Sequence, residues 1–268
     1  MRIINLMRLK YNFHTHTPRC GHAIGSEEEY VLGAIKAGIK SFGFSDHIFL
    51  PDLHEEGVRG DYEELDDYLN DINYLKEKYK DQIDIYVGFE AEYFEEYLDY
   101  YKELLDSHKI DYLLLGNHSF IKDGKIVDYF YPGCPKENLY EYARNTIEAM
   151  RSGLFKYLCH PDLFIDCYPE FDEDMKKCSI AIIKEAERLH MPLEVNLGGI
   201  IEDSWNEEHN YSCRGFFELT KNYNVDIVLG LDAHDLRYFE EKSINKAFDF
   251  IDKLGLNFQE DYHIWKRK

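Results

Sequence analysis

Short apolar runs alternate with longer amphipathic runs along most of this chain, a pattern typical of an α/β protein. We expect strands at residues 41–45, 83–89, 111–115, 156–160, 193–195 and 225–231, after a first strand that contains residues 13–16. Helical spacing of apolar side chains covers residues 26–35, 62–75, 94–105, 136–150, 172–189, 212–221 and 238–254. Seven strand–helix units predict a parallel sheet covered by helices. We expect this sheet to curl into an irregular barrel that stays open on one side.

Local signals refine this pattern at three places. Ser26 and Glu29 have the spacing of a capping box, which begins a helix. Residues 119–135 interrupt the alternation, and Asp123-Gly124 within them is a two-residue hairpin signal, so we expect a decorated loop there. Residues 196–211 are predicted to form a long loop before the next helix.

The composition fits one domain over residues 1–268, because a chain of this length with 44% apolar residues can bury a sizeable core. No apolar run reaches the roughly 18–20 residues that a membrane span needs. The first ten residues lack the long apolar stretch of a secretory signal. Six cysteines without a Cys-x-x-Cys pair favour reduced thiols. These features predict a cytoplasmic protein that binds no membrane.

A side chain that can bind a metal lies at or beside the end of most predicted strands. The candidates are His14, His16, His47, Glu90, His118, His160, Asp232 and His234, with His22 in a turn shortly after the first strand. One histidine pair means little in a chain with 12 histidines. The repetition is informative, because the carboxyl ends of parallel strands meet at one face of a barrel. We therefore expect these nine side chains to converge.

The nine candidates indicate more than one metal ion. His14 and His16 lie two residues apart on a strand, so both can point to the same face and chelate one ion. Glu90 has two carboxylate oxygens and can bridge two ions. Nine ligands are generous for two ions and fit three that share one carboxylate. Imidazole and carboxylate together suit Zn²⁺, Fe²⁺ and Mn²⁺ without choosing between them.

The net charge of −21 argues against binding to nucleic-acid polymers, which requires a basic face. An anionic substrate is still compatible with this charge if metals fill the pocket. Three divalent ions add about +6, whereas two carboxylate ligands remove about 2. The pocket would then be cationic inside an acidic molecule.

Together these motifs resemble those of the PHP superfamily (polymerase and histidinol phosphatase), and most of all its histidinol-phosphatase-like branch. They are His14-Thr15-His16 with His22, Ser45-Asp46-His47, Gly88-Phe89-Glu90, Gly116-Asn117-His118, Cys159-His160-Pro161-Asp162 and Asp232-Ala233-His234. They follow the family's order from residue 14 to residue 234. The resemblance implies a distorted (β/α)7 barrel of the PHP type that carries a site for three metal ions.

The resemblance also implies how the ligands are shared. The first ion would take His14, His16, Glu90 and Asp232, the second Glu90, His118 and His160, and the third His22, His47 and His234. A hydroxide bridging the first two ions would attack phosphorus directly, without a phosphoenzyme. The proton for the leaving group could come from Asp232, after this residue has accepted the proton of the hydroxide. It could also come from a metal-bound water. Residues 196–202 lack the basic residue that related histidinol phosphatases often carry after the sixth strand.

Two arginines are further catalytic candidates beside Glu90 and Asp232. Arg19 lies between two ligand segments and could clamp a phosphate with its planar guanidinium group. Arg214 lies at a predicted helix start near the sixth loop. For both, the alternative is an ordinary surface arginine.

Two other charged residues are weaker candidates for the pocket. Arg59 lies in a Gly-rich loop after the second strand, and Glu92 lies just past Glu90. Glu92 could pair with a substrate ammonium group, and the alternative for both is a solvated position at the rim.

The sequence predicts a metal-dependent phosphomonoesterase that converts L-histidinol phosphate and water to L-histidinol and phosphate, in histidine biosynthesis. The alternative is a PHP phosphoesterase of other specificity, acting on small nucleotides or other phosphate esters. A regulatory metal-binding protein without catalysis is a third possibility, against which the intact ligand set argues. The expected partner is a small phosphate ester, while the native metal and the oligomeric state stay open.

Overall fold

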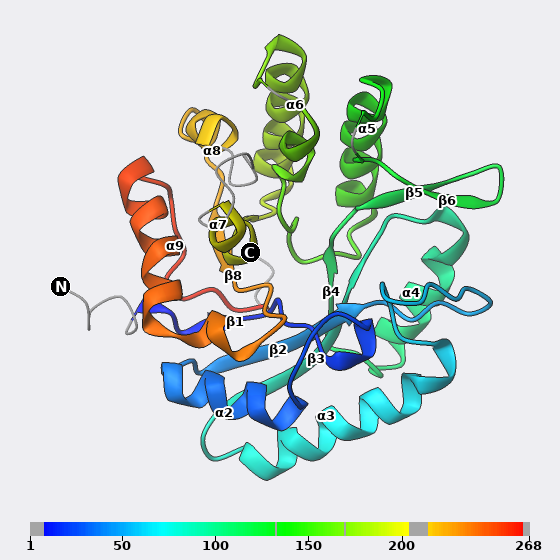
Figure 1. Cartoon of the computed structure of the whole chain (residues 1–268), viewed down its shortest axis with the longest axis vertical. Coiled ribbons are helices and arrows are strands. Elements are labelled where there is room, and N and C mark those ends of the chain that lie inside the picture. The colour runs from blue at the N-terminus through cyan, green and yellow to red at the C-terminus, as the bar shows by residue number, and fades with distance from the viewer. Residues whose placement is uncertain (1–7, 132, 169, 204–213, 265–268) are drawn as a thin grey trace.

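The computed structural model describes residues 8–131, 133–168, 170–203 and 214–264. A curled parallel sheet runs through it, with helices packed around the outside (Figure 1). Its strands are β1 (Tyr11–Asn12), β2 (Ser41–His47), β3 (Asp84–Ala91), β4 (Tyr112–Leu115), β7 (Leu193–Asn196) and β8 (Ile227–Gly230). With one further segment at Leu158, this arrangement is the distorted (β/α)7 barrel that the sequence predicts.

The strands follow chain order around the barrel. β1 to β4 pair as one sheet, and Leu158 forms parallel bridges to Leu115 of β4 and Leu193 of β7. In the described residues, a single bridge between Thr15 and Ala233 joins the two edges of the sheet beyond β8 and β1. This weak closure agrees with the expected barrel that is open on one side.

The predicted strand at residues 156–160 is reduced to the single bridging residue Leu158. The backbone still bonds on both sides there, since Cys159 N–H donates to Leu115 O at 2.9 Å and Glu194 N–H donates to Leu158 O at 3.0 Å. His160 then takes a positive φ of 27°, which ends the extended conformation. The prediction of a full strand was therefore too long.

Helices follow the strands closely, and α2 and α6 begin at side-chain caps. Their bounds are α2 (Glu27–Ala37), α3 (Leu65–Tyr79), α4 (Leu98–Asp106), α5 (Glu137–Ser152), α6 (Glu173–Leu189), α7 (Leu197–Asp203), α8 (Arg214–Thr220) and α9 (Glu241–Leu254). Ser26 and Glu29 form the predicted capping box of α2, and the Asp172 side chain accepts from two backbone N–H groups of α6. Within the described stretches, no helix combines the length and apolar character needed to cross a membrane.

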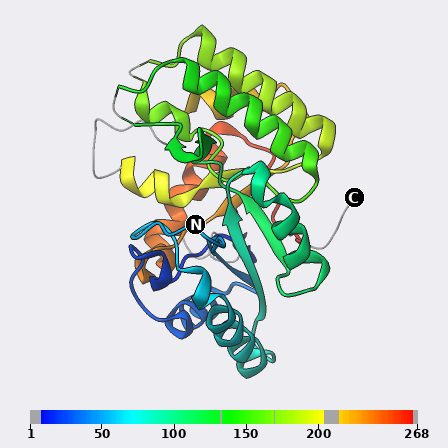
Figure 2. The same ribbon diagram turned by 90° about the vertical axis from the view of Figure 1, so that its right-hand side faces the viewer.

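Helices surround the barrel, and two groups of them, α5 with α6 and α3 with α4, lie on different sides of it (Figure 1). Figure 2 shows α5 and α6 side by side at one end of the molecule, away from α3 and α4. Arg151 of α5 and Glu185 of α6 join their surfaces, with Nε and Oε1 2.8 Å apart. The middle of the molecule between these groups holds the carboxyl ends of the strands.

Residues 197–203 form helix α7, where the sequence predicts part of a long loop. Asn196 begins this helix, because its Oδ1 accepts a hydrogen bond from Gly199 N–H at 3.1 Å. Gly198 and Gly199 have low intrinsic helix propensity, which hides the helix from a reading of the sequence. The rest of the predicted loop, residues 204–211, lies outside the described residues.

The segment after β4 forms the hairpin expected from Asp123-Gly124. Strands β5 (Ser119–Lys122) and β6 (Lys125–Asp128) pair antiparallel, with Ser119 opposite Asp128. Asp123 and Gly124 have φ values of 52° and 71°, as a type I′ turn requires. The hairpin projects beside the barrel in Figure 1. Its pairing places Asp128 next to the segment that carries His118.

Side chains of the strands alternate between two hydrophobic clusters. Tyr112 and Leu114 of β4 belong to a small cluster with Phe13, whereas Leu113 and Leu115 belong to the large cluster under the helices. Neighbouring residues of a strand point to opposite faces, so the small cluster fills the barrel interior. The interior is thus a packed core below the strand ends.

Tyr112→Phe should destabilise the fold by about 1–2 kcal/mol. The buried Tyr112 hydroxyl lies 2.8 Å from the carbonyl oxygens of both Phe13 and Phe44, so it ties β4 to the first two strand segments. Removing it takes away the donor that these two buried carbonyl oxygens share. Urea unfolding measures the change, with Tyr74→Phe as the control because Tyr74 is 64% exposed. Equal stability of the two variants would contradict this role.

Candidate metal centre

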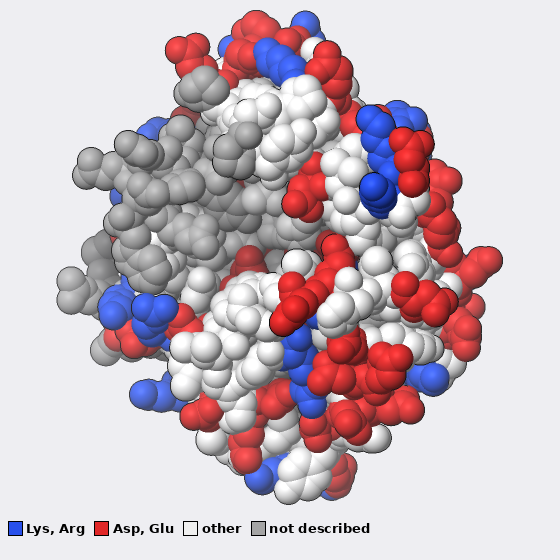
Figure 3. Space-filling view, turned by 45° about the vertical axis from the view of Figure 1, so that its right-hand side comes forward, with Lys and Arg blue, Asp and Glu red and all other residues white. Residues whose placement is uncertain are grey.

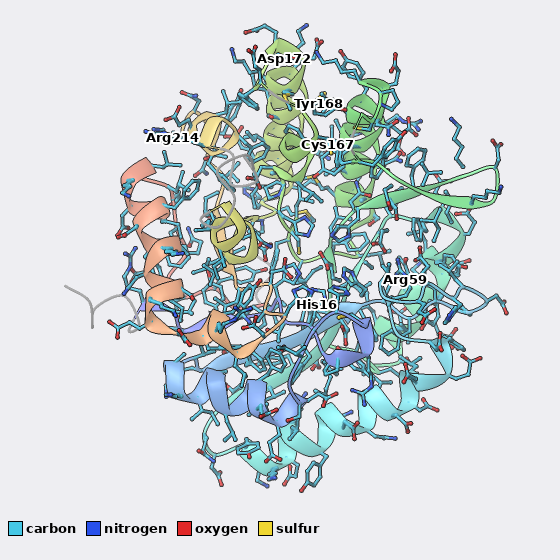
Figure 4. All side chains as sticks on the ribbon, viewed as in Figure 1. His16, Arg59, Cys167, Tyr168, Asp172 and Arg214 are labelled. Atoms are coloured by element: carbon cyan, nitrogen blue, oxygen red, sulfur yellow. The ribbon has the colours of Figure 1, made fainter. Side chains whose placement is uncertain are left out.

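A cavity of about 600 Å³ opens at the carboxyl ends of the strands. Eight of the nine predicted ligands line it: His16, His22, His47, Glu90, His118, His160, Asp232 and His234. The ninth, His14, is fully buried, and its Nε2 lies 3.4 Å from Glu90 Oε2. Figure 4 shows His16 in the middle of the molecule, between the two groups of helices. The structure thus brings all nine side chains together.

Glu90, near the end of β3, lies at the centre of the group and is 1% exposed. Imidazole nitrogens of five histidines surround its carboxylate: His14 at 3.4 Å, His16 at 3.5 Å, His47 at 3.2 Å, His118 at 3.6 Å and His160 at 2.8 Å. The first three approach Oε2 and the last two approach Oε1. Each carboxylate oxygen therefore has its own set of nitrogens, as a bridging ligand requires.

Asp232 is held next to two of the same histidines. Its Oδ1 lies 3.1 Å from His16 Nε2 and 3.4 Å from His14 Nε2. Its backbone has a φ of 50°, an uncommon conformation outside glycine that turns the chain just after β8. Its other oxygen, Oδ2, accepts from Asn196 Nδ2 at 3.1 Å. One oxygen is thereby left for the cavity.

A second group of imidazoles lies beside the first. It consists of His22, His47 and His234, each with a nitrogen within 4.8 Å of the others. His22 Nδ1 lies 3.0 Å from the carbonyl oxygens of Cys20 and Gly57, so Nδ1 carries the hydrogen. His234 Nδ1 is likewise 3.0 Å from the Asp232 carbonyl oxygen. Backbone acceptors of this kind fix the tautomer and leave Nε2 as the metal-binding atom.

Several buried nitrogen and oxygen atoms of the cluster have no hydrogen-bond partner among the described residues. They are His14 Nε2, both nitrogens of His16, His47 Nδ1, Asp232 Oδ1 and His234 Nε2. Buried polar atoms nearly always have hydrogen-bond partners, so a group of unpaired ones in one place indicates a site that binds a ligand. Cations between the facing lone pairs would satisfy these atoms, and nitrogen and oxygen donors of this kind suit Zn²⁺, Fe²⁺ or Mn²⁺. The residues present therefore fit a cluster of divalent ions.

Neighbouring charges put the two acids of the cluster in the form that binds metal. Burial alone would raise the pKa of Glu90 and Asp232, but the surrounding histidines, His14 above all, hold both well below the usual range. Burial lowers the pKa of His234 to about 4, so this ring is neutral near pH 7. The pKa of His16 is raised to about 9, because Asp232 and Asp46 outweigh its burial. An ion that binds His16 must therefore displace a proton.

The buried ion pair between Glu92 and Arg59 contacts His118 on the side of its Nδ1 atom. Glu92 Oε1 lies 3.1 Å from His118 Nδ1, and Arg59 donates to Glu92 Oε2 at 3.3 Å. Arg59 also donates to Glu55 at 2.6 Å. Burial would raise the pKa of Glu92, but Arg59 and His118 lower it to about 2. This arrangement directs His118 Nε2 toward Glu90.

The structure does not place Arg19 or Arg214 in the cavity. Arg19 pairs with Glu27 of α2 and, at 2.5 Å, with Asp71 of α3, so its guanidinium group already has two carboxylate partners. Arg214 is 72% exposed on α8 and pairs with Glu218 at 2.9 Å (Figure 4). Among the described residues, Arg59 is the one lysine or arginine that lines the cavity.

The reading of the sequence missed Glu194 of β7, and it assigned no role to Asn196, the polar residue at the end of the same strand. Glu194 is fully buried, with Oε1 2.9 Å from His14 Nδ1, and Asn196 contacts Asp232. Glu194 stands between two apolar residues in a strand that otherwise looks like core. The available signal was its spacing of two from Asn196, which puts both side chains on the same face.

Comparison with known proteins agrees with this site. The model of the PHP domain family matches residues 12–198. The chain belongs to the PHP family. This PHP protein is 30% identical to the "Probable histidinol-phosphatase" of Deinococcus radiodurans, over 82% of this chain and 85% of the relative. It is 26% identical to the "Histidinol-phosphatase" of Bacillus subtilis, over 89% of this chain and 99% of the relative.

A solved structure shows the same fold. The crystal structure of histidinol phosphate phosphatase from Lactococcus lactis subsp. lactis, complexed with zinc, L-histidinol and phosphate, matches with a TM-score of 0.72. The match covers 93% of this PHP protein and 95% of that chain at 18% sequence identity. Sequence and fold together place the protein in the histidinol-phosphatase-like branch of its family.

Proposed function

We propose that this PHP protein hydrolyses L-histidinol phosphate to L-histidinol and phosphate with three divalent ions held by its nine converging side chains. It is a phosphomonoesterase by its relatives, two of which are named as histidinol-phosphatases. The observation that carries the proposal is the buried cluster of unpartnered imidazole and carboxylate atoms around Glu90. Zinc, iron and manganese all suit these ligands.

The side chains divide into three sets, of which the first two share Glu90. His14, His16, Glu90 and Asp232 would hold one ion, Glu90, His118 and His160 a second, and His22, His47 and His234 a third. When bound, the ions supply an activated water as nucleophile and positive charge against the phosphoryl oxygens. Glu90 holds two of the sets together, and Asp232 keeps one oxygen directed into the cavity. That oxygen is placed to take up a proton during the reaction.

The wall of the cavity outside the ligands favours a substrate that also carries a positive charge. Its charged side chains are Glu55, Glu92, Asp128 and Arg59. Arg59 is already paired with Glu55 and Glu92, so its charge is balanced within the wall. Asp128, at the end of β6, adds a negative charge that has no partner among the described residues. An ammonium group on the phosphate ester would complement this wall, and L-histidinol phosphate has one.

Steady-state kinetics with the metal-replete protein test the proposal. The panel contains L-histidinol phosphate, 4-nitrophenyl phosphate and a nucleoside monophosphate. We expect kcat/KM to be highest for L-histidinol phosphate. Comparable or higher efficiency on another ester would overturn the substrate while leaving the phosphatase in place.

Asp128→Asn should raise KM for L-histidinol phosphate roughly two- to fivefold, the effect of losing one exposed charge pair. The kcat should change little, because Asp128 is not one of the predicted ligands. Kinetics with 4-nitrophenyl phosphate, which has no ammonium group, should be unaffected. Asp123→Asn, at the turn of the same hairpin, is the matched control. An equal effect on both esters would remove Asp128 from substrate recognition.

A PHP phosphoesterase of other specificity is the second candidate. The favouring observation is that residues 196–202 carry no lysine or arginine, so the sixth loop lacks the basic residue expected of a histidinol phosphatase. The same panel decides between the two, since preference for the nucleotide would favour the second.

A further inference from the structure

Glu194 is a buried acid that the proposed mechanism does not use. It lies on β7 and is fully shielded from solvent. No lysine or arginine pairs with it among the described residues; its contacts are instead with residues of the metal cluster. Its Oε1 and Oε2 lie 2.9 Å and 3.2 Å from His14 Nδ1. A charge buried at this depth is costly unless it is satisfied, so its partners are informative.

Glu194 contacts two of the segments that carry predicted ligands, and it is linked to a third through Asn196. Besides His14, its Oε2 accepts from the backbone N–H of His160 at 3.1 Å and from Asn196 Nδ2 at 3.0 Å. Asn196 Nδ2 also donates to Asp232 Oδ2, and these two atoms lie 3.1 Å apart. The amide orientation of Asn196 is fixed as well, because Oδ1 accepts from Gly199 N–H. The chain from Glu194 to Asn196 thus joins His14, His160 and Asp232.

The strand next to β7 leaves room for this carboxylate. A Cβ atom on Gly230 would lie 1.7 Å from Glu194 Oε1. Only glycine at this position lets Glu194 extend across the interior of the barrel toward His14. Glycine at 230 and glutamate at 194 therefore act as one feature of the β7–β8 pair.

We propose that Glu194 is a positioning residue for the metal cluster, acting with Asn196. It holds the hydrogen of His14 on Nδ1, so that Nε2 is the free atom facing Glu90 and Asp232. Through Asn196 it also fixes which oxygen of Asp232 faces the cavity. The inference rests on the metal-binding part of the proposed function.

A carboxylate is required at this position because all its neighbours donate. His14 Nδ1–H, His160 N–H and Asn196 Nδ2–H all point at the two oxygens. Glutamine has nearly the same shape, but its NH₂ group would face one of these donors. Second-layer partners of metal-binding histidines typically change metal affinity about 10- to 100-fold when they are replaced.

The test is metal binding by Glu194→Gln, measured by titrating the metal-free protein with Zn²⁺ and by metal content after dialysis. We expect one ion to bind about 10- to 100-fold more weakly than in the unmodified chain. The kcat should recover as Zn²⁺ is raised, and circular dichroism should show an intact fold. Glu173→Gln is the matched control, since the Glu173 side chain is 78% exposed on α6.

Each outcome separates this inference from the proposed function. If the unmodified chain binds no ions, the proposed function fails. If it binds them and Glu194→Gln binds them equally well, only the role of Glu194 fails. Should Glu194→Gln not fold, Asn196→Ala takes its place, because it removes the link to Asp232 and keeps the Glu194 charge. Unchanged metal affinity in Asn196→Ala would then overturn the inference.

Discussion

Glu90→Gln should reduce kcat for phosphate ester hydrolysis by about 1,000-fold or more. Among the residues that the structure describes, Glu90 is the one acid whose two oxygens face separate groups of histidines. The change therefore removes a ligand that two of the proposed sets share. The amide carries no negative charge and offers one oxygen in place of two. Loss of charge stabilisation by metal ions amounts to several kcal/mol of transition-state free energy, and each 1.4 kcal/mol is tenfold in rate. Steady-state kinetics at saturating Zn²⁺ measures the effect.

The matched control for Glu90→Gln is Glu96→Gln, which makes the same chemical change at an exposed position after β3. This control should keep full activity. Metal content should fall in Glu90→Gln and not in the control. If Glu90→Gln retained more than a tenth of the activity with a normal metal content, the shared carboxylate would not be part of the reaction.

Removal of the metal ions should abolish turnover and lower the melting temperature by about 10 °C. An ion at 1,000 times its Kd stabilises a folded protein by about 4 kcal/mol, and each kcal/mol corresponds to about 2–4 °C in a chain of this size. Without ions, buried nitrogen and oxygen atoms of His16, His47 and Asp232 have no hydrogen-bond partner in the part of the chain that the structure describes. Differential scanning calorimetry before and after dialysis against a chelator measures the shift.

Re-addition of metal provides the control for this experiment. Zn²⁺, Mn²⁺ or Fe²⁺ under anaerobic conditions should restore both activity and melting temperature, whereas Mg²⁺, which prefers oxygen ligands, should restore neither. Full activity in chelator-treated protein with no detectable metal would contradict the metal-dependent mechanism.

The acidic surface and the metal cluster have different roles in this account. Figure 3 shows acidic side chains spread over much of one face of the molecule, with few basic ones between them. This distribution follows from the net charge of −21. Under the proposed function, attraction of the phosphate group would have to come from inside the cavity, where three ions against two acidic ligands would leave about four positive charges. A surface of this charge repels anions at a distance.

The barrel and the convergence of the ligands could be predicted because both follow from a repeating pattern. Strand ends in a parallel barrel meet at one face, so Glu90 and Asp232 could be expected together from positions 142 residues apart. The capping box at Ser26 and the hairpin at Asp123-Gly124 were equally predictable, since each depends on a few neighbouring residues.

The surroundings of the ligands could not be predicted in the same way, because they depend on pairs distant in the chain. Arg19 looked suited to phosphate, but Asp71 lies 52 residues away and pairs with it. Arg59 reaches the cavity because Glu92, 33 residues further on, holds it there. Glu194 contacts His14 across 180 residues. Spacing along the sequence contains no information about such partners.

Anomalous diffraction from crystals of the metal-bound protein tests the central claim most directly. Data collected at the absorption edges of zinc, iron and manganese would both count the ions and identify them. The account predicts three peaks in the cavity, with Glu90 between two of them and His22, His47 and His234 around the third. A single peak, or an empty cavity in crystals soaked with all three metals, would contradict it.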